Sequence, residues 1–441
     1  MKNSHLQERN LNSELGSRNS RPVISRVLTV LLGLALCLWG IWQSSRIGLA
    51  RVFSQYGLLS GQVAATDKAV ALASLDAEAR YARAETLERS GNSSEAAAEF
   101  ERAAQLRPRD YYLWLRLGLV RDESEDQEGA LRALAEAAKL APYYAQPRWQ
   151  LGNLLLRMGR LDEAFAELRC ATLSDPGLLS DVIDLAWRVY SDNPQRVEDA
   201  VQPRTAHERM VLAGSFVRHG YSAAAVKQFR AAGETDRNEA RQLLRDLLHS
   251  KSFSEAYELW ANTHGINREP GIEIPGIYNG GFEGPLPLDD PGFGWEVTGN
   301  LSAISLSLDP SQAHSGNRSL RIEFGGDSNA LVPLITQIVL VKPATSYRLS
   351  FAARTEGIVT GGLPNVLVTD AGGDSVLGQS GEFPQTTNGW QDYTTDFKSG
   401  ESTRAIQIAV KRRPCSQAPC PIFGRLWLDD FSLQSVESRF Q

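Results

Sequence analysis

The chain has 441 residues, more than one hydrophobic core usually organises, so two or more domains are expected. Charged residues make up 22% and hydrophobic residues 42% of the chain, which is typical of folded domains and excludes a wholly disordered protein. The net charge of −6 at pH 7, without a basic patch interleaved with aromatic residues, argues against a nucleic-acid partner.

An apolar run near the N-terminus predicts a membrane span. Residues 1–22 are polar, and we expect them to form a disordered cytoplasmic tail. The stretch Val27–Trp42 carries no charge, and with its flanks it approaches the roughly 20 residues that cross a bilayer. Trp39 and Trp42 are typical of an interfacial belt. We predict a transmembrane signal-anchor helix over residues 23–45.

The basic residues around this run predict its orientation. Five basic residues precede it and two follow it closely: Lys2, Arg9, Arg18, Arg21 and Arg26, then Arg46 and Arg51. This excess places the N-terminus in the cytoplasm and the bulk of the chain in the periplasm, on the outer side of a bacterial inner membrane. A cleaved signal peptide is the alternative. It has a shorter apolar core and a small-x-small site, whereas tryptophans and glutamine follow here.

A 34-residue period organises the next part of the chain. Proline and small residues recur in one register: Pro108, Pro142 and Pro176; Ala96, Ala130 and Ala164; Ala103, Ala137 and Ala171; Leu117-Gly118 and Leu151-Gly152. This pattern resembles tetratricopeptide repeats, which are pairs of antiparallel helices. Small residues are expected where the two helices of a pair cross closely, and proline where the second helix ends.

The repeat pattern extends in weaker form on both sides, which predicts an all-α solenoid over residues 55–264. Residues 55–76 have the spacing of a half-repeat that covers the end of the stack. Residues 179–204 are helical but irregular in pattern, and residues 212–232 and 243–260 reproduce the spacing of two further units.

The resemblance to tetratricopeptide repeats implies a groove lined by the first helix of each pair. The repeat register assigns seven residues to it: Tyr81, Glu85, Tyr112, Leu115, Trp149, Asn153 and Arg157. A protein partner, either an extended peptide or a helix, would lie there with Tyr112 and Trp149 as anchors. The alternative is that these are ordinary surface and packing residues.

Beyond a Gly- and Pro-rich linker at residues 265–275, the period changes to two. Tyr347, Leu349, Phe351 and Ala353 alternate, as do Leu320, Ile322 and Phe324, and Ile406, Ile408 and Val410. Short alternating segments between turn residues predict an all-β sandwich over residues 276–441. The fold class is therefore multidomain: a transmembrane helix, an α-solenoid and a β-sandwich.

Six pieces of this β-domain, in order, resemble the carbohydrate-binding modules of families four and nine, which are galactose-binding-like jelly rolls. They are Asn279–Glu283, Gly294-Trp295, Ser315–Ile322, Val341–Phe351, Trp390–Tyr393 and Leu426–Leu433. The resemblance implies a jelly roll and a polysaccharide ligand, although a fold alone does not establish sugar binding.

Alternation places candidate sugar-binding side chains on the face opposite the core: Ser350, Arg354, Asn365, Gln407 and Lys411. Trp295, Trp390, Tyr393 and Trp427 are available as aromatic platforms, although Trp295 and Trp390 match fold positions. No cofactor is expected to be required. The family resemblance implies a structural Ca²⁺ held by Glu283 and Asp430 with Asn317, since hard oxygen donors suit this ion. The alternative is two solvated carboxylates.

Cys415 and Cys420 flank a short Pro-containing loop and are expected to form a disulfide in an oxidising compartment, or else remain a free dithiol. No nucleophile elbow, phosphate loop or metal-ligand triad is present in the sequence. We therefore expect a non-enzyme: a membrane-anchored periplasmic scaffold in exopolysaccharide or O-antigen assembly or export. The alternatives are a purely structural or protein-interaction role and a glycan-active enzyme.

Overall fold

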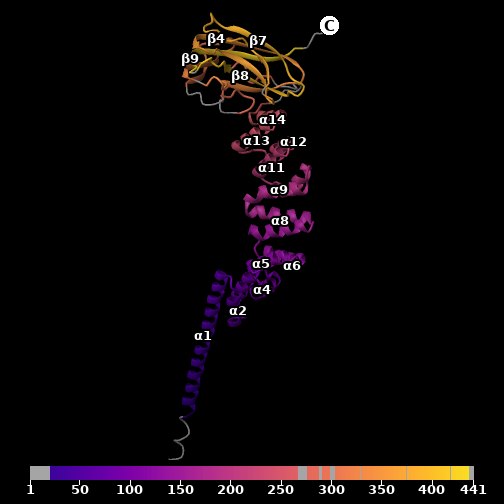
Figure 1. The fold of residues 1–441 in the computed structure, drawn as a ribbon, viewed down its shortest axis with the longest axis vertical. Coiled ribbons are helices and arrows are strands. Elements are labelled where there is room, and N and C mark those ends of the chain that lie inside the picture. The colour runs from indigo at the N-terminus through magenta and orange to yellow at the C-terminus, as the bar shows by residue number, and fades with distance from the viewer. Residues whose placement is uncertain are drawn as a thin grey trace, which may run out of the picture. The chain divides into compact units, whose positions relative to one another are not determined.

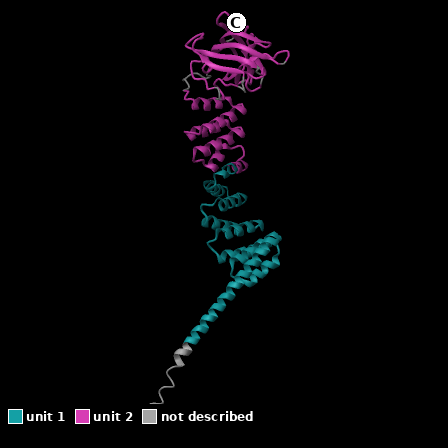
Figure 2. Ribbon diagram, turned by 90° about the vertical axis from the view of Figure 1, so that its left-hand side faces the viewer, with its two compact units in different colours: residues 1–182 teal, residues 183–441 magenta. Residues whose placement is uncertain are grey.

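The computed structural model describes residues 20–266, 276–287, 291–297, 303–327, 329–373, 375–417 and 419–436. The chain divides into two compact units, residues 1–182 and residues 183–441, coloured teal and magenta in Figure 2. Most of the predicted tail (1–22) and of the predicted linker (265–275) lies outside the described residues.

Helix α1 (Ser20–Ser60) opens the first unit. Its stretch Arg26–Ser60 is long and apolar enough to cross a membrane, and none of its apolar window is buried. The helix runs well past residue 45, where the predicted span ends, because no proline interrupts the following segment. It stops before Gly61, whose φ of 71° is the left-handed conformation that favours glycine.

The remaining helices of this unit pair in sequence order, as tetratricopeptide repeats do (Figure 1). They are α2 (Val63–Leu72), α3 (Ala77–Arg89), α4 (Ser93–Leu106), α5 (Tyr111–Glu123), α6 (Gln127–Leu140), α7 (Ala145–Arg157) and α8 (Leu161–Ser174). The side chains of Asp76 and Asp110 accept bonds from the first-turn amides of α3 and α5, and so fix where these helices begin.

The small residues of the repeat lie where the helices of a pair touch. A Cβ at Gly118 would lie 2.6 Å from Leu134 Cγ, and one at Gly152 would lie 2.7 Å from Leu168 Cγ. Ala130 and Ala164 are fully buried. The prediction of close helix crossings at these positions is thus confirmed.

A 3₁₀ turn (Pro176–Leu178) and helix α9 (Leu179–Val189) lead into the second unit. Five helices follow: α10 (Pro194–Val201), α11 (Ala206–Arg218), α12 (Ser222–Ala232), α13 (Arg237–His249) and α14 (Phe253–Thr263). Thr205 begins α11 with a capping box that it forms with Glu208.

The C-terminal strands form two antiparallel sheets. The strands are β1 (Ile304–Asp309), β2 (Ser319–Asp327), β3 (Ile335–Leu340), β4 (Ser346–Thr360), β5 (Pro364–Asp370), β6 (Val376–Gln379), β7 (Gln391–Lys398), β8 (Ala405–Arg412) and β9 (Pro421–Ser435). The five-stranded sheet has the order β1-β2-β9-β4-β7, and the four-stranded sheet has the order β3-β8-β5-β6.

One core fills the space between the sheets, as the period-two pattern predicted. Leu320, Leu349, Leu428 and Ile408 are fully buried members of this core. The last helix of the solenoid also packs on this domain: the Trp260 ring lies 5.1 Å from that of Tyr278 and 5.8 Å from that of Phe293. Helices α11–α14 and the sandwich therefore belong to one compact unit.

Candidate binding surfaces

The first-helix face of the solenoid brings together residues of α3, α5 and α7. Tyr81 and Tyr112 lie with their ring centroids 6.1 Å apart, so α3 and α5 present one continuous aromatic surface. Burial raises the pKa of the Tyr81 phenol, and a hydrogen bond with Tyr112 and the charge of Glu85 raise it further. Tyr81 therefore stays neutral at all physiological pH values.

Ion pairs border these tyrosines. Arg116 bridges Glu85 (2.8 Å) and Glu88 (2.5 Å), and its guanidinium lies 5.5 Å from the centroid of the Phe100 ring. The repeat register had selected Glu85 but not Arg116 or Glu88. Arg116 lies four residues after Tyr112, one turn along α5. This spacing could have indicated that Arg116 lies on the same face as Tyr112.

Farther along this face the predicted residues differ in what they offer a partner. Leu115 is fully buried in the core between α5 and α7, so its assignment to the groove is wrong. The Leu115 side chain is buried because it lies on a face of α5 that also packs against α7. Asn153 donates to the carbonyl of Trp149 (2.9 Å) on its own helix, and Arg157 forms an ion pair with Asp122 on α5.

In the sandwich, the predicted sugar-binding residues do not share one face. Arg354 lies on β4 of the five-stranded sheet, where it pairs with Trp427. Asn365 lies on β5 opposite Lys411 on β8, and both belong to the four-stranded sheet, as does Gln407. Since outward faces of packed sheets are separated by the core, Arg354 cannot form one cleft with the other three. The prediction of a common cleft is wrong.

Trp295 is also excluded as a sugar platform. Its side chain is 2% exposed and lies in the core, with its ring centroid 4.9 Å from that of Phe431. Its indole nitrogen donates to the carbonyl of Asn279 (3.2 Å), which satisfies the buried polar atom.

The outer face of the five-stranded sheet centres on Arg354. Its guanidinium lies 5.5 Å from the Trp427 ring centroid and donates to Gln312. The Trp427 indole nitrogen donates to Oδ2 of Asp309 (2.9 Å), the last residue of β1, and Trp427 is 3% exposed. Burial would raise the pKa of Asp309, but hydrogen bonds from Ser311 and Trp427 hold it below its ordinary value.

Beside Arg354 lies a cluster of His314, Trp390 and Asp392, of which the sequence indicated only Trp390. The His314 ring lies 5.6 Å from that of Trp390, and its Nε2 lies 3.5 Å from Asp392 Oδ1. Trp390 is only partly buried and directly precedes β7, whose first residue pairs with the neighbour of Arg354. His314 was not identified from the sequence because alternation describes strands, whereas His314 lies in a loop.

Two aspartates of β9 hold this loop. Asp429 is fully buried and accepts from the backbone amide of His314 (2.9 Å), while Asp430 accepts from the His314 ring (2.6 Å) and from Ser315 Oγ (2.6 Å). Asp430 has a φ of 54° at a register shift between β4 and β9, which turns its side chain toward the loop. Burial raises the pKa of Asp429, although its backbone hydrogen bonds oppose this.

The three residues predicted to hold Ca²⁺ are not arranged as a calcium site. Both oxygens of Glu283 accept N–H bonds from Asn317, at 2.6 and 3.2 Å, and Asp430 is bonded to His314 and Ser315 instead. The carbonyls of Glu283 and Gly284 accept from the guanidinium of Arg318. The donors that would face a cation are thus engaged by hydrogen-bond donors, and the residues do not fit the ion. Within the described ranges, no group of three or more His, Cys, Asp or Glu residues could hold a metal.

Cys415 and Cys420 are joined by a disulfide, with their Cα atoms 5.6 Å apart. The loop that they close supplies an acceptor to a buried guanidinium, because Arg412, 1% exposed, donates to the Cys420 carbonyl (2.7 Å); Arg412 also donates to Thr360 Oγ1 of β4 (3.0 Å). The bond therefore shapes the end of the four-stranded sheet.

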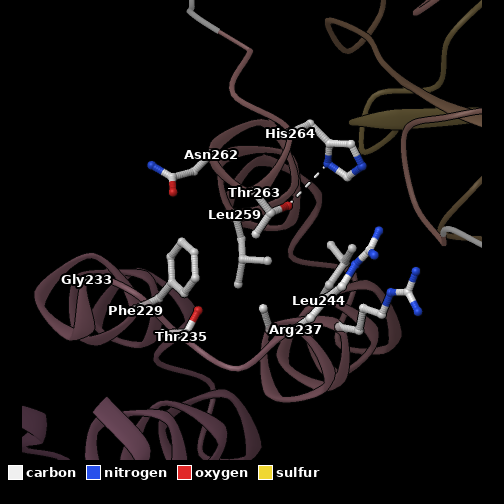
Figure 3. Close-up of a pocket in the computed structure, with 11 residues that line it drawn as sticks. Phe229, Gly233, Thr235, Arg237, Leu244, Leu259, Asn262, Thr263 and His264 are labelled. Atoms are coloured by element: carbon white, nitrogen blue, oxygen red, sulfur yellow. Dashed lines mark hydrogen bonds between the residues drawn. The ribbon is translucent and has the colours of Figure 1, made fainter. Parts of the chain in front are cut away.

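Helices α12–α14 line a pocket of about 370 Å³, shown in Figure 3. Its lining combines apolar and polar residues: Phe229, Ala240, Leu244 and Leu259, and Thr235, Arg237, Arg241, Asn262, Thr263 and His264. Thr263 Oγ1 lies 3.2 Å from His264 Nδ1.

Two segments of the chain match family models. Residues 275–417 match the model described as carbohydrate binding domain, and residues 77–120 match the model described as tetratricopeptide repeat. The chain thus combines a tetratricopeptide repeat region with a carbohydrate-binding-module-like sandwich, and both predicted resemblances are confirmed. No curated protein matches the chain.

Among solved structures, similar chains include the "Crystal structure of YrrB: a TPR protein with an unusual peptide-binding site", with 21% identity over 48% of this chain and 89% of that one (TM-score 0.28). "MamA 41-end from Desulfovibrio magneticus RS-1" has 19% identity over 42% and 93% (TM-score 0.29). "CBM4 structure and function" has 15% identity over 36% and 99% (TM-score 0.27). Likeness at this level carries no inference about function.

Proposed function

We propose that this protein is a membrane-anchored periplasmic scaffold whose tetratricopeptide helices bind protein partners and whose sandwich binds a polysaccharide. Its place would be in the assembly or export of exopolysaccharide or O-antigen. The observation that carries the proposal is the presence, in one chain, of matched repeat and carbohydrate-binding segments behind one long apolar helix.

The anchoring is supported by α1, which is long and apolar enough to cross a membrane. The excess of basic residues before it favours an N-terminus in the cytoplasm. The disulfide between Cys415 and Cys420 is consistent with an oxidising compartment for the sandwich.

For the sugar, we propose the Trp390 cluster in place of the cleft expected from sequence. A partly buried indole offers its face to the C–H groups of a pyranose, and charged side chains next to it supply hydrogen bonds to hydroxyls. The side chain of Asp392 is 82% exposed and that of His314 is 33% exposed, so both reach solvent beside the indole. Gln407 and Lys411, on the other sheet, would not contact this ligand.

For the protein partner, we propose the surface of α3, α5 and α7. Tyr112 is 41% exposed and lies beside Tyr81, and the ion pairs of Arg116 border both. An aromatic anchor region with polar edges is typical of peptide-binding surfaces.

Both matched segments are non-catalytic binding modules, and we propose that the protein is not an enzyme. A purely structural or protein-interaction role and a glycan-active enzyme are the alternatives.

The test is calorimetric titration of the full chain in lipid nanodiscs with bacterial polysaccharides. We expect binding that Trp390→Ala weakens at least about tenfold, equivalent to about 1.4 kcal/mol, while Gln407→Ala on the opposite sheet leaves it unchanged. If none of the polysaccharides gives measurable binding, the result would favour the structural role. Release of reducing ends by the full chain would favour the enzyme.

A further inference from the structure

Helix α1 carries an exposed apolar stripe that continues past the membrane span. In the segment from Arg46 to Ser60, four exposed residues lie 3, 4 and 3 positions apart: Leu49 (48% exposed), Val52 (63%), Tyr56 (52%) and Leu59 (86%). The same alternation of three and four continues backward through Ser45, Trp42, Leu38, Ala35, Leu31 and Leu28. This is the a/d pattern of a heptad repeat, sustained along most of the helix.

The opposite face of the same helix segment is already occupied by the solenoid. Ala50, Ser54 and Gly57 are buried there, and a Cβ at Gly57 would lie 2.4 Å from Thr66 of α2. Arg46 donates to the carbonyl of Leu72 (2.7 Å). The stripe therefore faces away from the rest of this unit.

Lipid does not account for the outer part of the stripe. A span of about 20 residues that begins at Val27 ends near Arg46. The segment from Ile47 to Leu59 then rises roughly 20 Å farther along the helix axis. Leu49, Val52, Tyr56 and Leu59 would thus stand in water if nothing covered them.

We propose that a second copy of this chain covers the stripe, through a parallel two-stranded coiled coil of α1 that runs from the membrane into the aqueous segment. Parallel pairing rests on the proposed anchoring, because two copies anchored in one membrane start at the same depth with the same direction. A 3.5-residue period also requires a partner helix that winds around the first.

The residues beside the stripe permit this pairing. In a parallel dimer, the g position of one helix faces the e position of the next heptad on its partner. Here Gly48 faces Phe53, and Gln55 faces Ser60. No like charges meet, so two identical helices associate without repulsion. The dimer would present two sandwiches on one membrane, and a polysaccharide that reaches both would be held by avidity.

The test is cysteine crosslinking of the full chain in membranes, with Cys37→Ala and Cys170→Ala to remove the free thiols. We expect Val52→Cys and Leu59→Cys to give at least tenfold more disulfide-linked dimer on oxidation than Ile47→Cys and Arg51→Cys. The two control positions are also exposed, and Ile47 is also apolar, but both lie off the stripe. Val52→Glu combined with Tyr56→Glu should abolish the Leu59→Cys crosslink.

Equal crosslinking at all four positions, no dimer at any of them, or linkage to a different protein would overturn the coiled coil. Sedimentation separates this result from the proposed function. If the chain sediments with membranes but does not crosslink, only the dimer fails. If the chain does not sediment with membranes, the proposed anchoring fails. The crosslinking is then measured on the soluble protein, and the coiled coil stands only if Val52→Cys and Leu59→Cys still give the dimer there.

Discussion

Glu99 shows how a single buried carboxylate joins two helices of a repeat. It lies on α4 with 2% of its side chain exposed, and Arg80 and Arg83 of α3 approach it to 2.8 Å. Arg102 of α4 approaches it to 2.6 Å. Burial alone would raise the pKa of Glu99, but the three guanidinium groups outweigh it and hold the pKa below the ordinary value of 4.5.

We predict that Glu99→Gln destabilises the protein by about 2–3 kcal/mol at neutral pH, because it removes the buried counter-charge that Arg80, Arg83 and Arg102 share. A carboxylate whose pKa is lowered in the folded state stabilises it above the unfolded-state pKa, and this contribution is lost as the pH falls through the folded-state pKa. The difference between wild type and variant should therefore shrink as the pH falls below the ordinary carboxyl pKa of 4.5. Urea unfolding at several pH values measures it.

The matched control is Glu95→Gln, an exposed position in the first turn of the same helix. We expect it to change stability by only a few tenths of a kcal/mol. A Glu99→Gln variant as stable as this control at neutral pH would contradict the role assigned to the ion cluster.

At the scale of residues, the spacing of side chains along a strand or helix correctly predicted which face each one is on. It did not predict which other elements pack against that face. The period of two placed Arg354 and Asn365 outside the core, yet it does not tell which of two sheets carries each. Leu115 occupies a groove register position, but in this unit α5 also packs there on α7. His314 was not predictable, because no periodicity describes a loop.

At the scale of elements, the guanidinium of Arg318 occupies the backbone carbonyls of the loop around Glu283, where the family resemblance implied a calcium ion. Arg318 donates to the carbonyls of Glu283 and Gly284, and the backbone amide of Arg318 donates to the Glu283 carboxylate (3.1 Å). The hydrogen bonds from Asn317 lower the pKa of Glu283, so this carboxylate stays charged.

We therefore predict that neither Ca²⁺ nor EDTA changes the melting temperature of the full chain by more than about 1 °C, because the oxygens are already engaged. Differential scanning calorimetry with each additive measures this. Arg318→Ala serves as the comparison, since it frees the carbonyls and should lower the melting temperature. A rise of several degrees with Ca²⁺ in the wild type would show that the ion displaces these bonds.

The disulfide loop at the end of β8 offers a second prediction at this scale. Closing the short loop between Cys415 and Cys420 should stabilise the fold by about 2 kcal/mol through the entropy of the unfolded chain. We expect the double variant Cys415→Ser/Cys420→Ser to lose this amount in urea unfolding. Reductant should destabilise the wild type by a similar amount and leave the double variant unchanged; sensitivity of both would point to another cause.

For the whole molecule, the boundary between compact units does not fall at the Gly- and Pro-rich linker. It falls at residues 182/183, while Trp260 of α14 packs on Tyr278 and Phe293 of the sandwich domain. Composition marked the change of secondary structure correctly. It did not reveal that aromatic residues on both sides of the linker share one cluster, because such contacts depend on tertiary packing.

The proposed membrane anchoring and orientation of the chain give the last prediction. Five basic residues before α1's apolar stretch and two after it favour a cytoplasmic N-terminus. We expect the full chain to stay with membranes at alkaline pH and to keep its full mass, and alkaline phosphatase fused to its C-terminus to be active, because that enzyme folds only where disulfides form. A version without residues 1–45 should remain soluble, with its fused phosphatase inactive.

A full-length chain in the soluble fraction, or a mass reduced by loss of the apolar stretch, would instead support a cleaved signal peptide. An inactive phosphatase on a membrane-bound chain would reverse the topology and leave Cys415 and Cys420 in a reducing compartment.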